Sequence, residues 1–364
     1  MTRLPKKRPD LSDLQALLAQ APALLDVRAP IEFAQGAIPG SINLPILNDE
    51  ERAAVGTAYR EQGGDAATRL GHELVSGPTR MTRLEAWQQC ARAHPDLRLI
   101  CWRGGSRSAI AQQWLRDAGT SIERVSGGYK ALRNACLHTL EEASADPHPW
   151  WVIAGKTGVA KTVAINRLPS AIDLEGLAHH RGSAFGAYPE PQPAPASFEN
   201  ALACAYLRVA PGVLVLEDES RTIGRIGLPE AWYRRMQQAP LAVIDATLDD
   251  RVAHIEMEYV SQPLQAGRSE AALAAHYLEA LRRIRRRLGG ALHQDLHAAM
   301  TAAFAGEQPH AVWIRRLLEE YYDPMYEYQL AKKQDRIRFS GSLEAVLEYL
   351  EAQQATTTHQ AHPS

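Results

Sequence analysis

Short, mostly apolar runs alternate along the chain with longer segments in which apolar residues recur every three or four positions. Short apolar runs bounded by loop-forming residues are typical of buried strands, and the longer period is typical of amphipathic helices. The strand-like runs are residues 24–27, 97–100, 122–125, 150–154 and 212–216. Helical spacing marks residues 11–23, 50–61, 84–93, 106–118 and 129–140. This alternation predicts an α/β fold in which helices cover both faces of parallel sheets.

One stretch interrupts the pattern and divides the chain. Residues 141–149 are polar, contain two prolines and lack periodicity, so we place a domain boundary there. The predicted domains are residues 1–145, which form a parallel-sheet domain, and residues 146–350, which form a second α/β domain with a helical C-terminal part. Residues 351–364 are predicted to be a disordered tail, because most of them are polar and they end the chain.

Composition narrows the range of functions. The formal net charge of −2 excludes a globally basic nucleic-acid binder, so any RNA contact must come from a local patch. The four cysteines are spaced too widely for a zinc site and are too few for a disulfide framework in 364 residues. No apolar run reaches the length of a membrane span, and no apolar segment follows the basic N-terminus. We therefore expect a cytoplasmic protein that does not contact a membrane.

The first candidate site is a cysteine at the end of the predicted strand 97–100. Cys101 is followed by a loop of small and basic residues that opens the predicted helix 106–118. Glycines allow several backbone N–H groups to turn inward, and the helix N-terminus adds positive potential. The loop residues expected to hold an anion beside the sulfur are Arg103, Gly104, Gly105, Ser106 and Arg107. The alternative is a buried structural cysteine.

This loop resembles the active-site loop of the rhodanese (sulfurtransferase) family. Other segments agree with that family in the right order: residues 24–28, 32–33, 36–45 and 126–129. The resemblance implies a rhodanese-like N-terminal domain. It also implies that Cys101 is the catalytic residue, which takes up sulfur or selenium as a persulfide or perselenide and passes it on.

The second candidate site follows the predicted strand 150–154. Residues 155–162 read Gly-Lys-Thr-Gly-Val-Ala-Lys-Thr and lead into a helix-like segment, which is the context that a phosphate-binding loop (P-loop) requires. We expect the backbone of Gly155, Thr157 and Gly158 to hold a diphosphate and Lys161 to neutralise it. Ala160 stands where such a loop usually has glycine. We therefore expect a tighter loop or an altered affinity for phosphate.

Acidic and basic residues extend this second site. The strand-like run 212–216 ends in carboxylates, as a Walker B strand does, so the predicted Mg²⁺ ligands are Thr162, Glu217 and Asp218. Between the two strands lies a glycine-rich polar segment, in which Arg181 is expected to contact phosphate.

Two segments near the C-terminus are candidate tRNA contacts. One is the arginine-rich helix around residues 282–287, and the other interleaves tyrosines with basic residues, as single-stranded RNA recognition requires. The candidates are Arg283, Arg286, Arg287, Tyr322, Tyr326, Lys332, Lys333 and Arg336. The alternatives are a solvated helix face and a tyrosine-rich helix packed on the core.

The two sites in this order resemble the bacterial tRNA 2-selenouridine synthases, a family in which a rhodanese domain is fused to a P-loop domain. Further motifs that carry the resemblance lie at residues 55–57, 173–177, 180–183, 185–186, 217–220 and 322–326. The resemblance implies a transferase that acts on the wobble 2-thiouridine of the tRNA anticodon. The family geranylates the 2-sulfur with geranyl diphosphate, then replaces the geranylthio group with selenium from selenophosphate, and Mg²⁺ is a candidate cofactor.

Three other functions remain open at this point. The chain could be a simple sulfurtransferase, or a P-loop ATPase or kinase with a rhodanese-like regulatory domain. It could also be a non-catalytic RNA- or protein-binding module. A rhodanese loop without catalytic function would be expected to lack the cysteine, but Cys101 is present.

Overall fold

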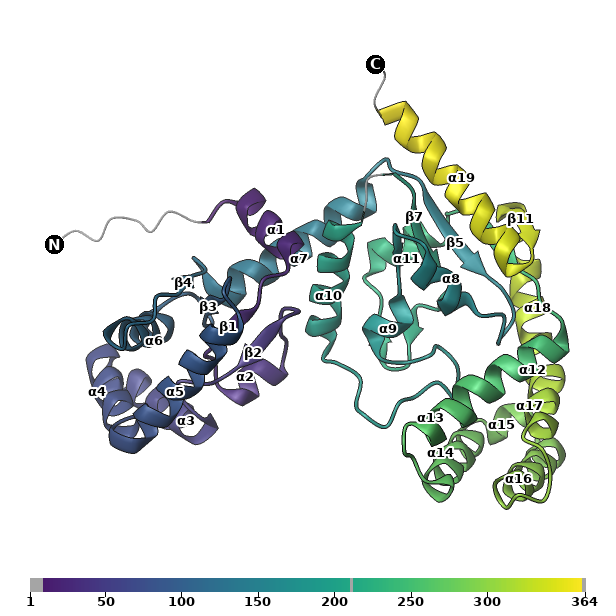
Figure 1. Cartoon of the computed structure of the whole chain (residues 1–364), viewed down its shortest axis with the longest axis horizontal. Coiled ribbons are helices and arrows are strands. Elements are labelled where there is room, and N and C mark those ends of the chain that lie inside the picture. The colour runs from purple at the N-terminus through teal and green to yellow at the C-terminus, as the bar shows by residue number, and fades with distance from the viewer. Residues whose placement is uncertain (1–8, 210–211, 362–364) are drawn as a thin grey trace. The chain divides into compact units, whose positions relative to one another are not determined.

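The computed structural model describes residues 9–209 and 212–361, and it divides into two compact units (Figure 1). The first unit comprises the residues up to Ala145 together with Pro193–Arg208, and the second comprises Asp146–Gln192 and the residues from Val209 onward. Both units contain a parallel sheet with helices, which confirms the predicted α/β fold class.

The first unit is built on a four-stranded parallel sheet in the order β2-β1-β3-β4. Its strands are β1 (Leu24–Asp26), β2 (Ser41–Asn43), β3 (Arg98–Ile100) and β4 (Glu123–Arg124). Its helices are α1 (Leu11–Gln20), α2 (Pro30–Ala34), α3 (Asp49–Gln62), α4 (Gly64–Leu74), α5 (Gly77–Ala93), α6 (Ser106–Asp117), α7 (Gly128–Ala145) and α10 (Pro195–Arg208).

Alternating residues of the short strands supply the two faces of this sheet. Leu25 and Leu99 pack with Trp87 of α5 and Trp114 of α6 in one core. Leu24 faces the other way, where α1, α7 and α10 lie together (Figure 1). The predicted boundary near residue 145 placed α10 in the second domain, whereas in the structure α10 belongs to the first unit. The division of the chain into two continuous domains is therefore wrong for residues 193–208.

The second unit is built on a five-stranded parallel sheet in the order β11-β10-β5-β7-β6. Its strands are β5 (Trp150–Ala154), β6 (Ala171–Ile172), β7 (Leu214–Glu217), β10 (Leu241–Ile244) and β11 (Ile337–Gly341), and β8 (Thr222–Ile223) with β9 (Ile226–Gly227) forms a small hairpin. The helices around the sheet are α8 (Lys161–Arg167), α9 (Leu174–Ala178), α11 (Glu230–Met236) and α19 (Leu343–Ala361). Because helices cover the sheet, every residue of the central strand β5 is apolar and buried.

The predicted helical C-terminal part forms a second core of its own, which includes Leu273, Tyr277, Leu296 and Trp313. Its elements are α12 (Leu248–Glu256), η1 (Met257–Ser261), α13 (Gln262–Gln265), α14 (Glu270–Arg283), α15 (Arg285–Leu288), α16 (Gly290–Phe304), α17 (Ala311–Leu317), η2 (Leu318–Tyr322), α18 (Asp323–Ala331) and η3 (Gln334–Arg336).

The chain end differs from its prediction. The predicted disordered tail, residues 351–364, is helical as far as Ala361, because α19 continues without a break, and residues 362–364 lie outside the described residues. Val346, Leu347 and Leu350 anchor this helix in the core beside β5. Among the described residues, no helix is both long and apolar enough to cross a membrane.

Candidate active sites in the two units

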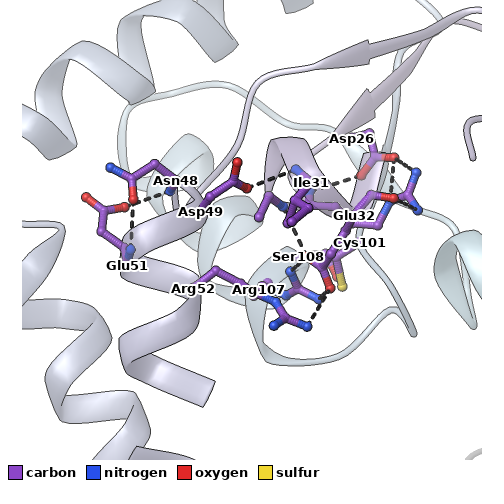
Figure 2. Close-up of polar contacts among 12 residues, drawn as sticks. Asp26, Ile31, Glu32, Asn48, Asp49, Glu51, Arg52, Cys101, Arg107 and Ser108 are labelled. Carbon is purple, nitrogen blue, oxygen red and sulfur yellow. Dashed lines mark hydrogen bonds and ion pairs between the residues drawn. The ribbon is translucent and has the colours of Figure 1, made fainter. Parts of the chain in front are cut away.

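Cys101 lies directly after β3 and is 2% exposed. Its sulfur is 3.2 Å from the hydroxyl of Ser108, which lies in the first turn of α6 (Figure 2). The thiol therefore lies where a parallel strand ends and a helix begins, as the sequence predicted. Gly105, the N-cap residue of α6, and the following Ser106 bring the helix N-terminus to the same point.

Glycines allow the Cys101 loop to pack closely against the turn at residues 126–129. Gly104 has φ +63°, and a side chain there would place its Cβ 2.9 Å from the nitrogen of Gly127. Gly128 has φ +58°, and its Cβ would lie 2.2 Å from the carbonyl oxygen of Cys101. The Tyr129 N–H donates to that carbonyl at 2.9 Å. Only glycine fits both positions, because the backbones approach too closely for a Cβ.

Arg107 does not add a free charge to the cradle, because it forms a two-pronged ion pair with Glu32 of α2 (Figure 2). Arg52 of α3 lies 3.7 Å from the same carboxylate. Burial alone would raise the pKa of Glu32, but the hydrogen bonds and charges of Arg107 and Arg52, with the Ala29 N–H, lower it overall. Arg103 remains exposed. Arg107 and Arg52 therefore share the Glu32 carboxylate, and Arg103 contributes more of the positive charge of the loop than Arg107 does.

A buried ion pair, whose role the sequence did not show, supports the turn at residues 126–129. Arg28 and Asp26 are both 0% exposed and lie 2.7 Å apart. Arg28 also donates to the carbonyl of Gly36 at 2.8 Å, and its guanidinium lies 3.8 Å from the centre of the Tyr129 ring. Burial raises the pKa of the Asp26 carboxyl, which the hydrogen bonds and charge of Arg28 oppose. The pair fixes the position of Tyr129, and thereby the turn against which Cys101 rests.

The second site is the loop after β5. Gly155, Thr157, Gly158, Lys161 and Thr162 line a cavity of about 200 Å³. The Lys161 ammonium donates to the carbonyl of Gly155 at 2.9 Å, so it lies along the loop as a P-loop lysine does. Arg181 lines the same cavity, and its guanidinium lies between the rings of Tyr188 and Tyr259, at 4.3 and 4.6 Å. The predicted diphosphate contacts are thus brought together in space.

Arg251 of α12 holds the loop in place, a role that no pattern in the sequence indicates. Its guanidinium is 3% exposed, donates to the carbonyl of Thr157 at 2.9 Å and forms a two-pronged ion pair with Asp323. Lys156 of the loop lies 2.6 Å from Glu327 and 3.5 Å from Asp323. Asp323, which lies between the predicted RNA contacts Tyr322 and Tyr326, therefore helps to position the phosphate loop.

The predicted Mg²⁺ ligands are not assembled. The carboxylate of Asp218 is bound by Lys333 at 2.7 Å, and that of Glu217 is fully buried and accepts the N–H of Glu175 at 3.2 Å. The Thr162 hydroxyl instead faces Glu175, at 3.5 Å. Within the described ranges, no three acidic, histidine or cysteine residues are arranged to hold a metal ion. The present donor set does not fit the predicted metal site, so no step is assigned to Mg²⁺.

The carboxyl groups that do surround the loop share an unusual environment. Burial raises the pKa of Glu175, and it raises those of Glu217 and Glu219 further, with the neighbouring carboxylates adding to the shift. Lys161 opposes the shift at Glu175 and Glu219. Because a raised pKa favours the neutral acid, these groups repel a bound diphosphate less than exposed carboxylates would.

The family is decided by comparison with known proteins. A family model described as the tRNA 2-selenouridine synthase AAA domain matches residues 148–357, and the rhodanese-like domain model matches residues 10–135. A tRNA 2-selenouridine synthase of Azotobacter vinelandii is 46% identical over 94% of this chain and 97% of its own. Those of Cupriavidus necator and Marinobacter nauticus are 45% and 42% identical over 96% of this chain and 99% of their own. The chain belongs to the tRNA 2-selenouridine synthase family.

As a member of the tRNA 2-selenouridine synthase family, the chain is an enzyme, a transferase. One solved structure, the N-terminal domain of a putative ATP/GTP binding protein from Clostridium difficile 630, covers 31% of this chain and 88% of its own at 30% identity. Its TM-score of 0.28 is too low to bear on the fold or the function.

Several of the predicted tRNA contacts are buried or have partners within the chain. Tyr322 is 6% exposed and belongs to the helical core, and Tyr326 lines the phosphate-loop cavity. Lys333 is held by Asp218, and Arg336 donates to the carbonyls of Ala239 and Met236. Tyr322, Lys333 and Arg336 do not form the predicted RNA surface, because burial or an internal partner occupies each of them, whereas an RNA contact of Tyr326 stays a prediction. Lys332 remains outside, 4.0 Å from the ring centre of Tyr328.

Ala160 has the left-handed conformation that its position in the loop suggested, with φ +66°. That conformation costs a residue with a Cβ about 1 kcal/mol, which is similar to what glycine loses through its greater freedom in the unfolded chain. We therefore expect Ala160→Gly to leave the free energy of unfolding unchanged or slightly raised. Ala275→Gly, at an exposed position within α14, should lower it by about 1 kcal/mol. Urea denaturation measures both, and an equal loss would show that Ala160 is not strained.

Proposed function

We propose that this chain performs two successive reactions on the wobble 2-thiouridine of tRNA, one in each unit. The phosphate loop binds geranyl diphosphate and supports geranylation of the 2-sulfur. The Cys101 site then supports replacement of the geranylthio group by selenium from selenophosphate. The observation that carries the proposal is that each unit has a loop between a strand and a helix that is a candidate anion site, one built around a lysine and the other around a buried thiol.

In the first reaction the 2-sulfur attacks C1 of the geranyl group, the C1–O bond breaks, and diphosphate leaves while N3 of the base loses its proton. The developing charge lies on the diphosphate, so backbone N–H groups of residues 155–162 and the Lys161 ammonium are placed to stabilise it. Nothing in this step requires a nucleotide base.

In the second reaction selenium attacks C2 of the base and geranylthiolate leaves. Water cleaves the P–Se bond, so the products are 2-selenouridine, geranylthiol and phosphate. Alkylation makes the sulfur a better leaving group, which explains why geranylation comes first. Phosphate is the product only if Cys101 positions the selenium donor. A perselenide on Cys101 would take selenium without its bonding electrons, and phosphorus would leave as phosphite.

Mass spectrometry of wobble nucleosides tests the proposal. The full chain is incubated with 2-thiouridine-containing tRNA and geranyl diphosphate, and selenophosphate is added afterwards. We expect S-geranyl-2-thiouridine after the first addition and 2-selenouridine after the second. Absence of the geranylated nucleoside at every time point, with 2-selenouridine still formed, would contradict the two-step order.

For tRNA binding we retain the arginines of α15. Arg286 and Arg287 are exposed and form no ion pair with any residue that the structure describes, whereas Arg282 and Arg283 are bound by Glu279. Free arginines can release counterions from RNA phosphates, but arginines already paired with a carboxylate gain less.

We therefore expect the double variant Arg286→Ala/Arg287→Ala to weaken tRNA binding and to reduce the slope of log affinity against log salt by roughly 0.7 to 0.9 per lost contact. The variant Arg282→Ala/Arg283→Ala removes the same formal charge and should change the slope much less. Filter binding over a salt series measures both. Equal slopes in the wild type and the first variant would mean that α15 is only a solvated helix face.

A further inference from the structure

Cys101, although only 2% exposed, lines a hollow of about 970 Å³, which is far larger than a small tetrahedral anion requires. Cys101 and Trp102 form one wall, and α3 forms the other. A second hollow of about 440 Å³ adjoins it and shares the side chains of Leu47, Val55 and Tyr59. All of these residues belong to the first unit.

Both apolar and positively charged side chains line this hollow, which indicates a ligand with an apolar part and an anionic part. Leu47, Ala53, Val55 and Tyr59 offer apolar surface, and Tyr59 remains 64% exposed although it is a large aromatic residue. Arginines also line the hollow: Arg52, Arg60, Arg103 and Arg107. Apolar walls lined with cations are complementary to a hydrocarbon chain attached to a polyanion.

One residue of α3 has no explanation in packing. Gly56 lies inside the helix, where glycine is less stable than alanine, and it has no positive φ that would require glycine. A Cβ at Gly56 would meet no atom of the described chain outside the backbone of its own helix within 4 Å, so the residue does not make room for a neighbouring element. Gly56 does line the hollow beside Cys101. The missing side chain leaves space for something that is not protein.

We propose that this hollow binds the geranyl chain of S-geranylated tRNA while selenium replaces the geranylthio group next to Cys101. The inference rests on the two-step function proposed above and adds the place where the leaving group is held. The apolar wall of α3 removes the hydrocarbon from water, and the arginines bind the phosphates of the same RNA or of selenophosphate. The thiol then lies at the junction of the two, where the C–S bond is broken.

Binding of an anticodon stem-loop RNA to the full chain tests the proposal without requiring turnover. We expect the wild type to bind the S-geranyl-2-thiouridine RNA about tenfold or more tightly than the 2-thiouridine RNA, because the chain is buried only in the former. Gly56→Leu would fill the hollow and abolish this difference. Ala54→Leu adds the same side chain to an exposed position of α3 that does not line the hollow, and it should keep the difference.

Two results would overturn the proposal. One is equal affinity of the wild type for both RNAs, and the other is an unchanged preference in Gly56→Leu. A third result separates the binding site from the two-step function. If Gly56→Leu loses the preference for geranylated RNA and Ala54→Leu keeps it, but the wild type forms no 2-selenouridine, the binding site is supported and the two-step function is contradicted. Circular dichroism of both variants shows whether the overall helix content is retained.

Discussion

Replacement of Cys101 by alanine is expected to abolish formation of 2-selenouridine and to leave geranylation at the wild-type rate. The thiol lies at the end of β3, beside the Ser108 hydroxyl and the hollow, and no other cysteine lines that hollow. In the proposed function geranylation uses the phosphate loop of the other unit, and none of the described residues that line its cavity is a cysteine. Mass spectrometry of nucleosides from tRNA treated with both co-substrates should therefore show S-geranyl-2-thiouridine accumulating as the final product.

Two control variants separate the chemistry of Cys101 from its packing. Cys101→Ser keeps the size and a hydrogen bond to Ser108, and it should fail in selenation as the alanine variant does. Cys90→Ala removes another buried cysteine from the same core and should retain selenation. Wild-type selenation by Cys101→Ala would remove the thiol from the reaction. Phosphorus NMR of the wild-type products distinguishes phosphate, which a positioning role predicts, from phosphite, which a perselenide predicts.

Replacement of Lys161 by alanine is expected to lower the rate of geranylation by about 100- to 1,000-fold, because the departing diphosphate loses the loop lysine that lines the cavity. Selenation of tRNA that has already been geranylated should continue at the wild-type rate. Release of diphosphate measures the first reaction, and formation of 2-selenouridine from purified geranylated tRNA measures the second.

Lys156→Ala is the matched control within the same loop. Lys156 is paired with Glu327 and Asp323 and does not line the cavity, so its loss should reduce geranylation far less than the loss of Lys161. Similar losses in both variants would indicate that the loop has collapsed rather than lost a counter-charge. If Lys161→Ala also stopped selenation of geranylated tRNA, the two reactions would depend on a common site.

The parts of both sites that are local in sequence could be predicted from it. Cys101 and its glycines, like the loop 155–162, are runs in which a strand, a turn and a helix start follow one another, so spacing alone defines their geometry. The parallel sheets followed from the alternation of short apolar runs with helical segments. These predictions needed no knowledge of which distant segments meet.

The predictions that failed depended on contacts between segments far apart in the chain. Lys333 meets Asp218, and Asp323 meets Arg251, across separations that no local pattern reports. A tyrosine at helical spacing looks the same whether it faces RNA or, as Tyr322 does, a core formed by other helices. The apolar face of α10 could equally have covered either sheet, and only the full set of contacts assigns it to the first.

The return of α10 has a consequence for synthesis. Phe198, Leu202 and Cys204 of this helix are almost fully buried, and α10 packs against α1 and α7. A nascent chain grows from its N-terminus, and domains generally fold in that order. The rhodanese-like unit cannot complete its core until residue 208 has been made, when β5, α8, β6 and α9 have already been synthesised. The apolar strands of the second unit are therefore exposed while the first unit is still incomplete. Both units are prone to aggregation during the same interval of synthesis on the ribosome.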